Sequence, residues 1–337
     1  MVDTQALAAA LMTHYGLEVS SIVIMRTVYG VVTRGSEKYI WKFVRGGESV
    51  QRLLSLQPAL DYLAQFEIDN AGPIATLHGE RIAYLKDGTV GYLQPWLPGR
   101  HVNLGERQER LMAVATIAHM HRSFAQVKAA GVLPVELPTP GGQLPARLRA
   151  KQVALRRSFA VAKTQFPDLA EVEQQIFSAA DSVADLFAQP YFLPEDGYKV
   201  LCHRDLAPHN MLWHDRKIAL IDFDRAGLDD PFTDFMQIAN HSLFSCTPES
   251  SHFADMVAVY TRIHPLSERR LNKLWQLLYF PDVLIRTLAE WVKNGCPDEK
   301  RDRLIAAVQS EQQRWAVLEQ NDSDRVRSPR AIGNAGF

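Results

Sequence analysis

Two short segments of the chain carry residue types suited to metal-assisted chemistry on a hydroxyl group. The first is residues 203–210 (His-Arg-Asp-Leu-Ala-Pro-His-Asn), and the second is residues 221–224 (Ile-Asp-Phe-Asp). A carboxylate such as that of Asp205 can orient an attacking hydroxyl group and accept its proton. The amide oxygen of Asn210 and the carboxylate of Asp222 are hard oxygen ligands, which Mg²⁺ prefers. These types together fit the transfer of a phosphoryl group from a Mg²⁺-bound nucleotide.

The spacer between the two segments has the pattern of a strand, a turn and a second strand. A hairpin brings its two ends together, so we expect Asn210 and Asp222 to share one metal ion. Asp224 either acts as a further ligand or faces away, and the sequence does not decide between the two. A plain polar turn is the alternative for any one of these residues, but their joint occurrence around a hairpin argues against it.

The rest of the chain divides into a part rich in strands and a part rich in helices. An opening helix ends at Gly16, and a meander of strands follows, including 22–25 and 39–44. The later elements are a helix over about 48–66, strands near 81–85 and 90–93, and helices at about 106–130, 144–165, 168–188, 233–245, 250–262, 267–294 and 298–319. We therefore predict a nucleotide-binding lobe over residues 1–94, a hinge over 95–100, a helical lobe over 101–320 and a poorly ordered tail over 321–337.

Composition excludes several classes of protein. Of the 337 residues, 37 are basic and 38 acidic, which argues against a broadly cationic surface for nucleic acid. Three cysteines at wide spacing suit a reducing compartment better than a disulfide framework. No signal peptide and no membrane span are expected. We therefore expect a cytoplasmic protein, with spore association as a second possibility, that is a monomer or a homodimer and binds neither nucleic acid nor membrane.

The chain resembles the kinase-like phosphotransferase superfamily that includes the aminoglycoside phosphotransferases and choline kinases. The resemblance rests on residues 202–210, 220–226, 230–235 and the hinge run 93–100, and it extends over about residues 15–315. Residues 203–210 match the kinase catalytic-loop pattern H-R-D-L-x-x-x-N. Within the superfamily the chain looks most like the spore-coat CotS-like group, because of the Leu-Ala-Pro-His-Asn loop and Phe280-Pro281. The resemblance implies an α+β, two-lobed protein-kinase-like fold with a small antiparallel-sheet lobe and a larger helical lobe.

One spacing separates the chain from the protein kinases. Those enzymes carry D-F-G, a long activation segment and then A-P-E. Here Asp222-Phe223-Asp224 is followed within a few residues by Asp230-Pro231, and no Ala-Pro-Glu is present. The platform for a protein substrate is therefore missing, and a small molecule with a hydroxyl or amine group is the expected acceptor.

The resemblance also assigns the nucleotide contacts. Lys42, on an alternating strand, becomes the lysine that holds the phosphates of ATP; the alternatives are an edge-strand lysine facing solvent, or Lys38 in its place. Gly30 is the only glycine of the predicted nucleotide-covering turn. Kinases pair the lysine with a helix glutamate, but the middle of helix 48–66 has none, so Glu48, Asp61 or neither is the partner. The hinge residues Leu93, Gln94 and Trp96 are expected to bind adenine, although Trp96 packing into the core is favoured over nucleotide stacking.

Four buried-type residues have structural interpretations. His121 and His203 are expected to brace the catalytic loop, Asp234 either to cap a helix or to bond that loop, and Cys202 to be a small buried residue. Two functions follow for the whole chain. The first is an ATP- and Mg²⁺-dependent phosphotransferase with Asp205 as base. The second is a catalytically silent, structural protein of the spore-coat type, which the missing glutamate and the poor glycine loop favour.

Overall fold

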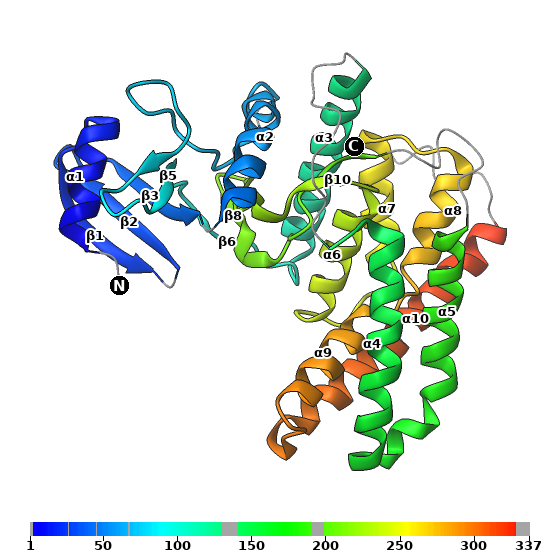
Figure 1. The fold of residues 1–337 in the computed structure, drawn as a ribbon. Coiled ribbons are helices and arrows are strands. Elements are labelled where there is room, and N and C mark those ends of the chain that lie inside the picture. The colour runs from blue at the N-terminus through cyan, green and yellow to red at the C-terminus, as the bar shows by residue number, and fades with distance from the viewer. Residues whose placement is uncertain are drawn as a thin grey trace.

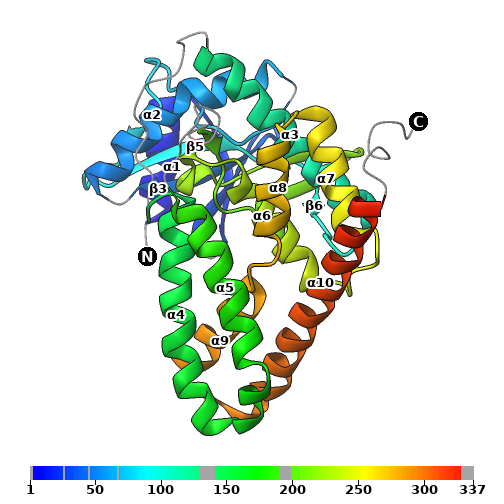
Figure 2. The ribbon, with the colours of Figure 1, turned by 90° about the vertical axis from the view of Figure 1, so that its right-hand side faces the viewer.

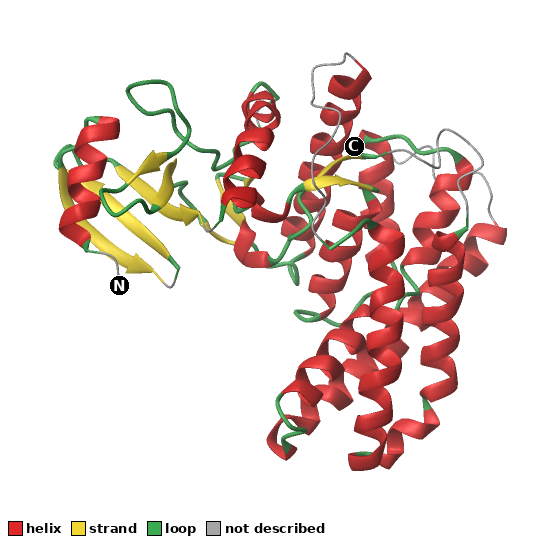
Figure 3. Cartoon of the chain, viewed as in Figure 1, coloured by secondary structure: helices red, strands yellow, loops and turns green. Residues whose placement is uncertain are grey.

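The computed structural model describes residues 3–25, 27–44, 46–66, 68–129, 141–189 and 199–327. They form a small lobe of strands at one end of the molecule and a larger, mostly helical lobe at the other (Figure 1). Among the described residues, strands occur in the small lobe and in an island where the two lobes meet (Figure 3). The predicted two-lobed α+β architecture is confirmed.

The small lobe is built on one antiparallel sheet with the order β1-β2-β3-β5-β4. Its strands are β1 (Val19–Met25), β2 (Val28–Thr33), β3 (Lys38–Val44), β4 (Ala83–Tyr84) and β5 (Val90–Pro95). Helix α1 (Thr4–Tyr15) contributes Leu7 and Leu11 to a core that also contains Trp41 of β3. The Asp3 side chain caps the first turn of α1, and Gly16 ends it in the left-handed conformation, as the sequence predicted.

Helix α2 (Gly47–Ala64) follows β3 in the chain but belongs to the core of the other lobe. It continues to Ala64 past Pro58, and Leu56, Leu60 and Leu63 pack into the large hydrophobic cluster of the helical lobe. The segment after α2 is also bonded to that lobe, because Leu220 exchanges backbone hydrogen bonds with Asp69 and Ala71. Residues 47–71 therefore pack with the helical lobe, although they fall within the range 1–94 that we expected to form the small lobe.

All the remaining helices of the described residues belong to the large lobe. Helix α4 has the bounds predicted for it, and it pairs along its length with α5 (Figure 2). The helix predicted over 267–294 is interrupted at Phe280-Pro281, where proline has no N–H to continue the helical bonds. The helices are α3 (Arg107–Ala129), α4 (Leu144–Gln165), α5 (Glu173–Ala188), α6 (Phe232–Leu243), α7 (His252–Ile263), α8 (Glu268–Leu277), α9 (Asp282–Lys293) and α10 (Arg301–Arg327), with 3₁₀ turns η1 (Pro167–Glu171) and η5 (Asp298–Lys300).

The ends of the chain differ from expectation in one respect. Helix α10 extends to Arg327, into the range 321–337 where we expected a poorly ordered tail. Residues 328–337 lie outside the described part of the chain. Among the described residues, no helix is both long and apolar enough to cross a membrane.

The strand-rich island lies where the two lobes meet. Strand β6 (Arg100–His101), which follows the hinge, pairs with β8 (Met211–His214), and β8 pairs with β9 (Lys217–Leu220). A second pair joins β7 (Val200–Cys202) to β10 (Gly227–Asp229). The 3₁₀ turns η3 (Pro208–Asn210) and η4 (Phe223–Arg225) complete the island. Both chemical motifs of the sequence are therefore held on short strands against the helical core.

Candidate active site

The predicted hairpin between the two motifs is present. Strands β8 and β9 are joined by the two-residue turn Asp215-Arg216, and both residues have positive φ values, of 46° and 61°. Such a turn matches the twist of antiparallel strands and fixes their register. At the open end of the hairpin, the Ile221 N–H donates to the Asn210 carbonyl at 3.0 Å. Asn210 and Asp222 therefore lie next to each other, at the two ends of the hairpin.

Asp205 lies in the loop that leads into the hairpin, and its side chain is partly exposed. The Asn210 side chain donates from Nδ2 to the Asp205 carbonyl at 2.8 Å. The Asp205 N–H approaches His203 Nδ1 at 3.3 Å. Because Nδ2 of Asn210 is engaged by the loop, the amide oxygen Oδ1 is the atom that it offers to a metal ion.

A buried carboxylate organises this loop from below. Asp234 on α6 accepts hydrogen bonds from the backbone N–H groups of His203 at 2.7 Å and Arg204 at 2.8 Å. His121 Nε2 approaches the same carboxylate at 3.1 Å. Burial alone would raise the pKa of Asp234, but the bonds from His121 and the loop hold it below its usual range. Of the two roles left open by the sequence, Asp234 has the second: it bonds the catalytic loop.

Two further side chains hold the loop in place. His203 Nε2 lies 2.9 Å from the Ile221 carbonyl, which ties the first motif to the second. Gln237 accepts from the Leu206 N–H and donates to the Arg204 carbonyl, at 2.8 and 2.7 Å. The bracing role of His203 was expected, whereas Gln237 was not identified from sequence, because a glutamine inside a helix carries no distinctive spacing.

The backbone is strained on both sides of the site. Arg204 and Asp222 are non-glycine residues with φ values of 68° and 65°, in the left-handed region. The Arg204 guanidinium is fixed by buried Asp229, with Nε at 3.1 Å from Oδ2. Such strain persists only where the surrounding structure enforces it, and it is concentrated at functional sites. Here the two strained residues are Asp222 itself and the residue directly before Asp205.

Lys42 of the small lobe reaches across to the second motif. Its Nζ lies 2.8 Å from Asp222 Oδ1 and 3.0 Å from Asp224 Oδ2. Burial alone would lower the pKa of Lys42, but Tyr92 and the two carboxylates more than offset this and raise it above its ordinary range. Strand β3 is internal to the sheet, so Lys42 is not an edge-strand lysine facing solvent. Lys38 instead lies near the Trp96 ring, with Nζ 6.0 Å from its centroid.

Helix α2 supplies no described acid to Lys42. Asp61 is engaged with Arg81 at 3.1 Å and Gln57 at 2.7 Å, and the side chain of Glu48 lies outside the described residues. Instead, Arg52 of α2 reaches the second motif and donates to the Ala226 carbonyl. The carboxylates of Asp222 and Asp224 are therefore the acids that orient Lys42 in this structure.

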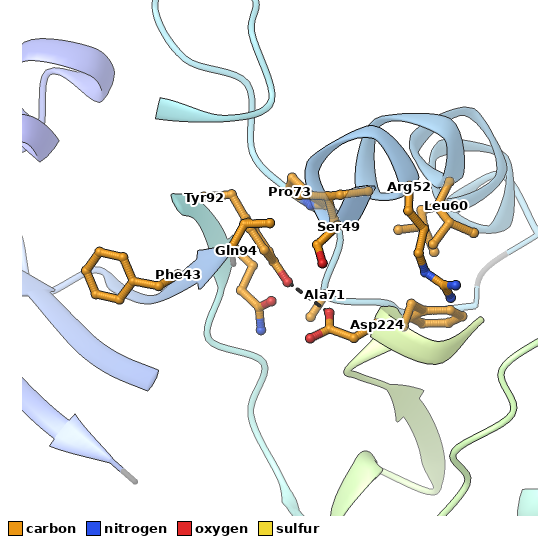
Figure 4. A pocket seen from close by; sticks show the side chains of 13 residues that line it. Phe43, Ser49, Arg52, Leu60, Ala71, Pro73, Tyr92, Gln94 and Asp224 are labelled. Atoms are coloured by element: carbon orange, nitrogen blue, oxygen red, sulfur yellow. Dashed lines mark hydrogen bonds between the residues drawn. The ribbon is translucent and has the colours of Figure 1, made fainter. Parts of the chain in front are cut away.

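A pocket of about 290 Å³ opens beside this ion pair, between β3, β5, α2 and Asp224 (Figure 4). Figure 4 shows Tyr92 and Gln94 of β5 facing Arg52 and Ser49 of α2 across the pocket. The Tyr92 hydroxyl donates to Asp224 Oδ1 at 3.4 Å. The pocket therefore adjoins the groups that would hold the phosphates of a nucleotide.

The hinge residues and Gly30, which we predicted to contact the nucleotide, do not all line the pocket. Gln94 lines the pocket, but Leu93 is buried in the small-lobe core, and its carbonyl accepts from the Ile74 N–H at 2.7 Å. The Trp96 N–H donates to the Lys38 carbonyl at 3.3 Å. Gly30 lies within β2 rather than in the turn, and a Cβ there would be 2.6 Å from the Trp96 ring. Gly30 is therefore required for packing against Trp96.

The residues at the hairpin mouth fit a divalent cation. Asn210, Asp222 and Asp224 offer only oxygen atoms, the donor type that Mg²⁺ selects. The ammonium group of Lys42 already occupies a cation position against the two carboxylates. Both carboxylates contact the Lys42 ammonium group, so Asp224 does not face away, which was the alternative that the sequence left open.

The architecture is that of kinase-like phosphotransferases. Several solved structures share it across nearly the whole chain: an aminoglycoside phosphotransferase from Alicyclobacillus acidocaldarius (16% identity, 97% of each chain covered, TM-score 0.77), an amicoumacin kinase in complex with AMP-PNP, Ca²⁺ and Ami (15%, 95% of this chain and 94% of that one, 0.61), and a spectinomycin phosphotransferase in complex with ADP and its antibiotic (15%, 94% and 98%, 0.58). At these identities, the likeness establishes the fold.

Residues 25–271 match the model of the phosphotransferase enzyme family, and the chain belongs to that family. The superfamily expected from the motifs is thereby confirmed, while the comparisons give no support to a closer relationship with the CotS-like group. No curated protein matches the chain in sequence.

Proposed function

We propose that the protein transfers the γ-phosphoryl group of ATP to a hydroxyl or amine group of a small molecule. The observation that carries the proposal is the convergence of Asp205, Asn210 and Asp222 from the helical lobe with Lys42 from the small lobe. In the transfer to a hydroxyl, the acceptor oxygen bonds to the γ-phosphorus, and the bond from that phosphorus to the β,γ-bridging oxygen breaks. The electron pair leaves with ADP, and the hydroxyl proton passes to Asp205.

Each residue has a distinct role in this proposal. Asp205 orients the acceptor and receives its proton, and Lys42 holds the phosphates. Asn210, Asp222 and Asp224 would hold Mg²⁺, which neutralises charge on the phosphates when it is bound. Asp234 and Gln237 are positioning residues, because they touch the backbone of the catalytic loop rather than the reacting atoms. Most of the rate enhancement would come from positioning and charge neutralisation.

A small acceptor is favoured by the short distance in sequence between Asp222 and Asp230. The intervening residues are used by η4 and β10, which pairs with β7. They leave no segment that could form a platform for a protein substrate. The Asp230 carboxylate is itself held by Arg270 in a buried double ion pair, at 2.7 and 2.8 Å.

An adenine nucleotide is the proposed donor. Of the structures that share this fold, the amicoumacin kinase holds AMP-PNP and the spectinomycin phosphotransferase holds ADP, whereas aminoglycoside 2'-phosphotransferase structures hold GDP. In this chain, Gln94 and Tyr92 face the pocket beside Lys42, so we place the nucleotide there. Gly30, Leu93 and Trp96 would then act by shaping the small lobe around the nucleotide.

A melting experiment tests the proposal directly. ATP should raise the melting temperature of the wild-type protein more with Mg²⁺ than with EDTA, because only the metal complex satisfies both phosphates and carboxylates. Asp222→Ala should remove the metal-dependent part of the rise. A catalytically silent structural protein would show no metal-dependent rise.

A further inference from the structure

A second pocket, of about 510 Å³, opens on the helical lobe beside the catalytic loop. Its walls come from the loop, the end of α6, helix α9 and the first half of α10, and α9 packs against both α6 and α10. Pro208 lines it and follows Asp205 by three residues, so the two backbones are at most about 11 Å apart. Its volume is within the range of small-molecule sites.

The charged side chains of this pocket are mostly cationic. Arg286 of α9, Lys300 of η5 and Arg303 of α10 line it, against the single acid Glu290. Among the described residues, no carboxylate forms an ion pair with any of the three cations. A cavity in which cationic side chains outnumber acidic ones concentrates anionic ligands.

Arg286 is already positioned as a binding group. Its Nη1 lies 3.3 Å from His241 Nε2, and its guanidinium lies 5.7 Å from the centroid of the Phe244 ring. Phe244 is 51% exposed at the pocket wall and provides an apolar surface beside this cation. Burial and the charge of Arg286 lower the pKa of His241 to about 4, although Asp282 opposes this, and His209 and Lys151 add to it. The neutral His241 ring therefore accepts from Arg286 rather than repelling it.

We propose that this pocket binds the phosphate acceptor and that the acceptor is a hydroxylated molecule with a carboxylate or phosphate group. The anionic group would pair with Arg286, and an apolar part would rest on Phe244, so that a hydroxyl faces Asp205. A polycationic acceptor would instead meet three like charges. The inference rests on the proposed function for the transfer itself, but the charge preference can be measured without turnover.

A matched pair of probes tests the charge preference. We would titrate 4-(hydroxymethyl)benzoate and 4-(hydroxymethyl)benzylamine, which share the ring and hydroxyl and differ in charge, into the full-length protein by ligand-observed NMR. The carboxylate should bind more tightly by about tenfold, the size expected for one charge-assisted contact. Arg286→Gln should remove that preference. Arg262→Gln, an exposed arginine on α7 that does not line the pocket, is the matched control and should retain it.

The outcomes separate this inference from the proposed function. Equal binding of the two probes, tighter binding of the amine, no binding of either at 10 mM, or an unchanged preference in Arg286→Gln would overturn the anionic acceptor. Mg²⁺-dependent ATP binding, measured in the same samples by the melting temperature, reports on the proposed function alone. If that binding persists while the charge preference is absent, the phosphotransferase proposal stands and only the acceptor class is wrong.

Discussion

The Lys42 ammonium group contacts the Asp222 carboxylate at 2.8 Å across 180 residues of sequence, and this pair joins the two lobes. In the proposed function the same carboxylate binds Mg²⁺. Lys42 and the metal ion therefore compete for Asp222 until a nucleotide provides phosphate oxygens for both. The pair thus gives the site a defined geometry before any ligand is bound.

Replacing Lys42 with methionine should have opposite effects on two binding equilibria. Mg²⁺ alone should bind more tightly, because Asp222 and Asp224 lose their competing cation. ATP with Mg²⁺ should bind more weakly, because the phosphates lose a positive charge. Isothermal titration calorimetry measures both. Lys38→Met, on the same strand but beside Trp96, is the control, and equal effects of the two variants would contradict the assignment of Lys42.

Asp205→Asn should abolish phosphoryl transfer and leave ATP binding nearly intact. The change keeps the size of the side chain and removes the group that accepts the proton, which costs about 10²–10⁴-fold in rate. The rate of ADP formation with an identified acceptor measures the loss, and calorimetry measures the binding. Turnover close to that of the wild type would show that another residue acts as the base.

Asp222→Ala should make ATP affinity independent of Mg²⁺, and Asp224→Ala should have a smaller effect. Asp222 follows directly from the hairpin that holds Asn210, and its side chain is the less exposed of the two, at 42% against 55%. Mg²⁺ titrations of ATP affinity in both variants test the order. Retention of full metal dependence in Asp222→Ala would exclude this motif as the metal site.

Gly91→Ala should destabilise the small lobe. A Cβ at Gly91 would lie 2.3 Å from the Trp41 ring and 2.7 Å from the Lys42 carbonyl, and neither group has room to move within the sheet. Overpacking of this kind costs about 1–3 kcal/mol. Urea unfolding measures the loss. At Gly35 an added Cβ has 3.7 Å to its nearest neighbour, so Gly35→Ala is the control and should change stability little.

The buried His252 should make the protein less stable in acid. Burial, with Arg110 and Arg314, lowers the pKa of His252 from 6.5 to about 3, so the unfolded chain takes up a proton that the folded chain excludes. This contribution to stability is complete above pH 6.5 and is lost as the pH falls toward 3. Between pH 7 and pH 5, the free energy of unfolding of His252→Gln should therefore fall by about 2 kcal/mol less than that of the wild type. Urea unfolding at the two pH values measures both changes. An equal fall in the free energy of unfolding for the wild type and the variant would contradict the assignment.

The sequence was sufficient where local patterns determine structure. Helix α4 has its predicted bounds, Gly16 ends α1, and the hairpin after Asn210 is in place, because caps, turn residues and hydrophobic spacing act over a few positions. The two motifs around this hairpin could be recognised for the same reason, since the residues of each are close in the chain.

Long-range packing accounts for what the sequence could not predict. The described partners of Lys42, Asp222 and Asp224, are distant in the chain, so no local pattern around helix 48–66 could reveal them. We expected Gly30 in a turn. The sequence did not show that the ring of Trp96 requires a glycine at this position, because the two residues are 66 positions apart. The sequence also did not show which segments belong to which lobe, because the leucines of α2 could pack into either of the two cores.

The packing of α2 against the helical lobe determines which parts of the protein can move as units. The sheet and α1 share one core and α2 packs into the other, so the chain passes between the two cores near Gly46, near Ile74 and at the hinge after Pro95. Gly46, with a φ of 84° and no atom within 4 Å of an added Cβ, is free to adjust. A tilt of the sheet on these connections would widen the pocket between β5 and α2. Because α2 packs into the core of the helical lobe, such a tilt would separate Lys42 from Asp222 and leave the contact of Arg52 with Ala226 in place.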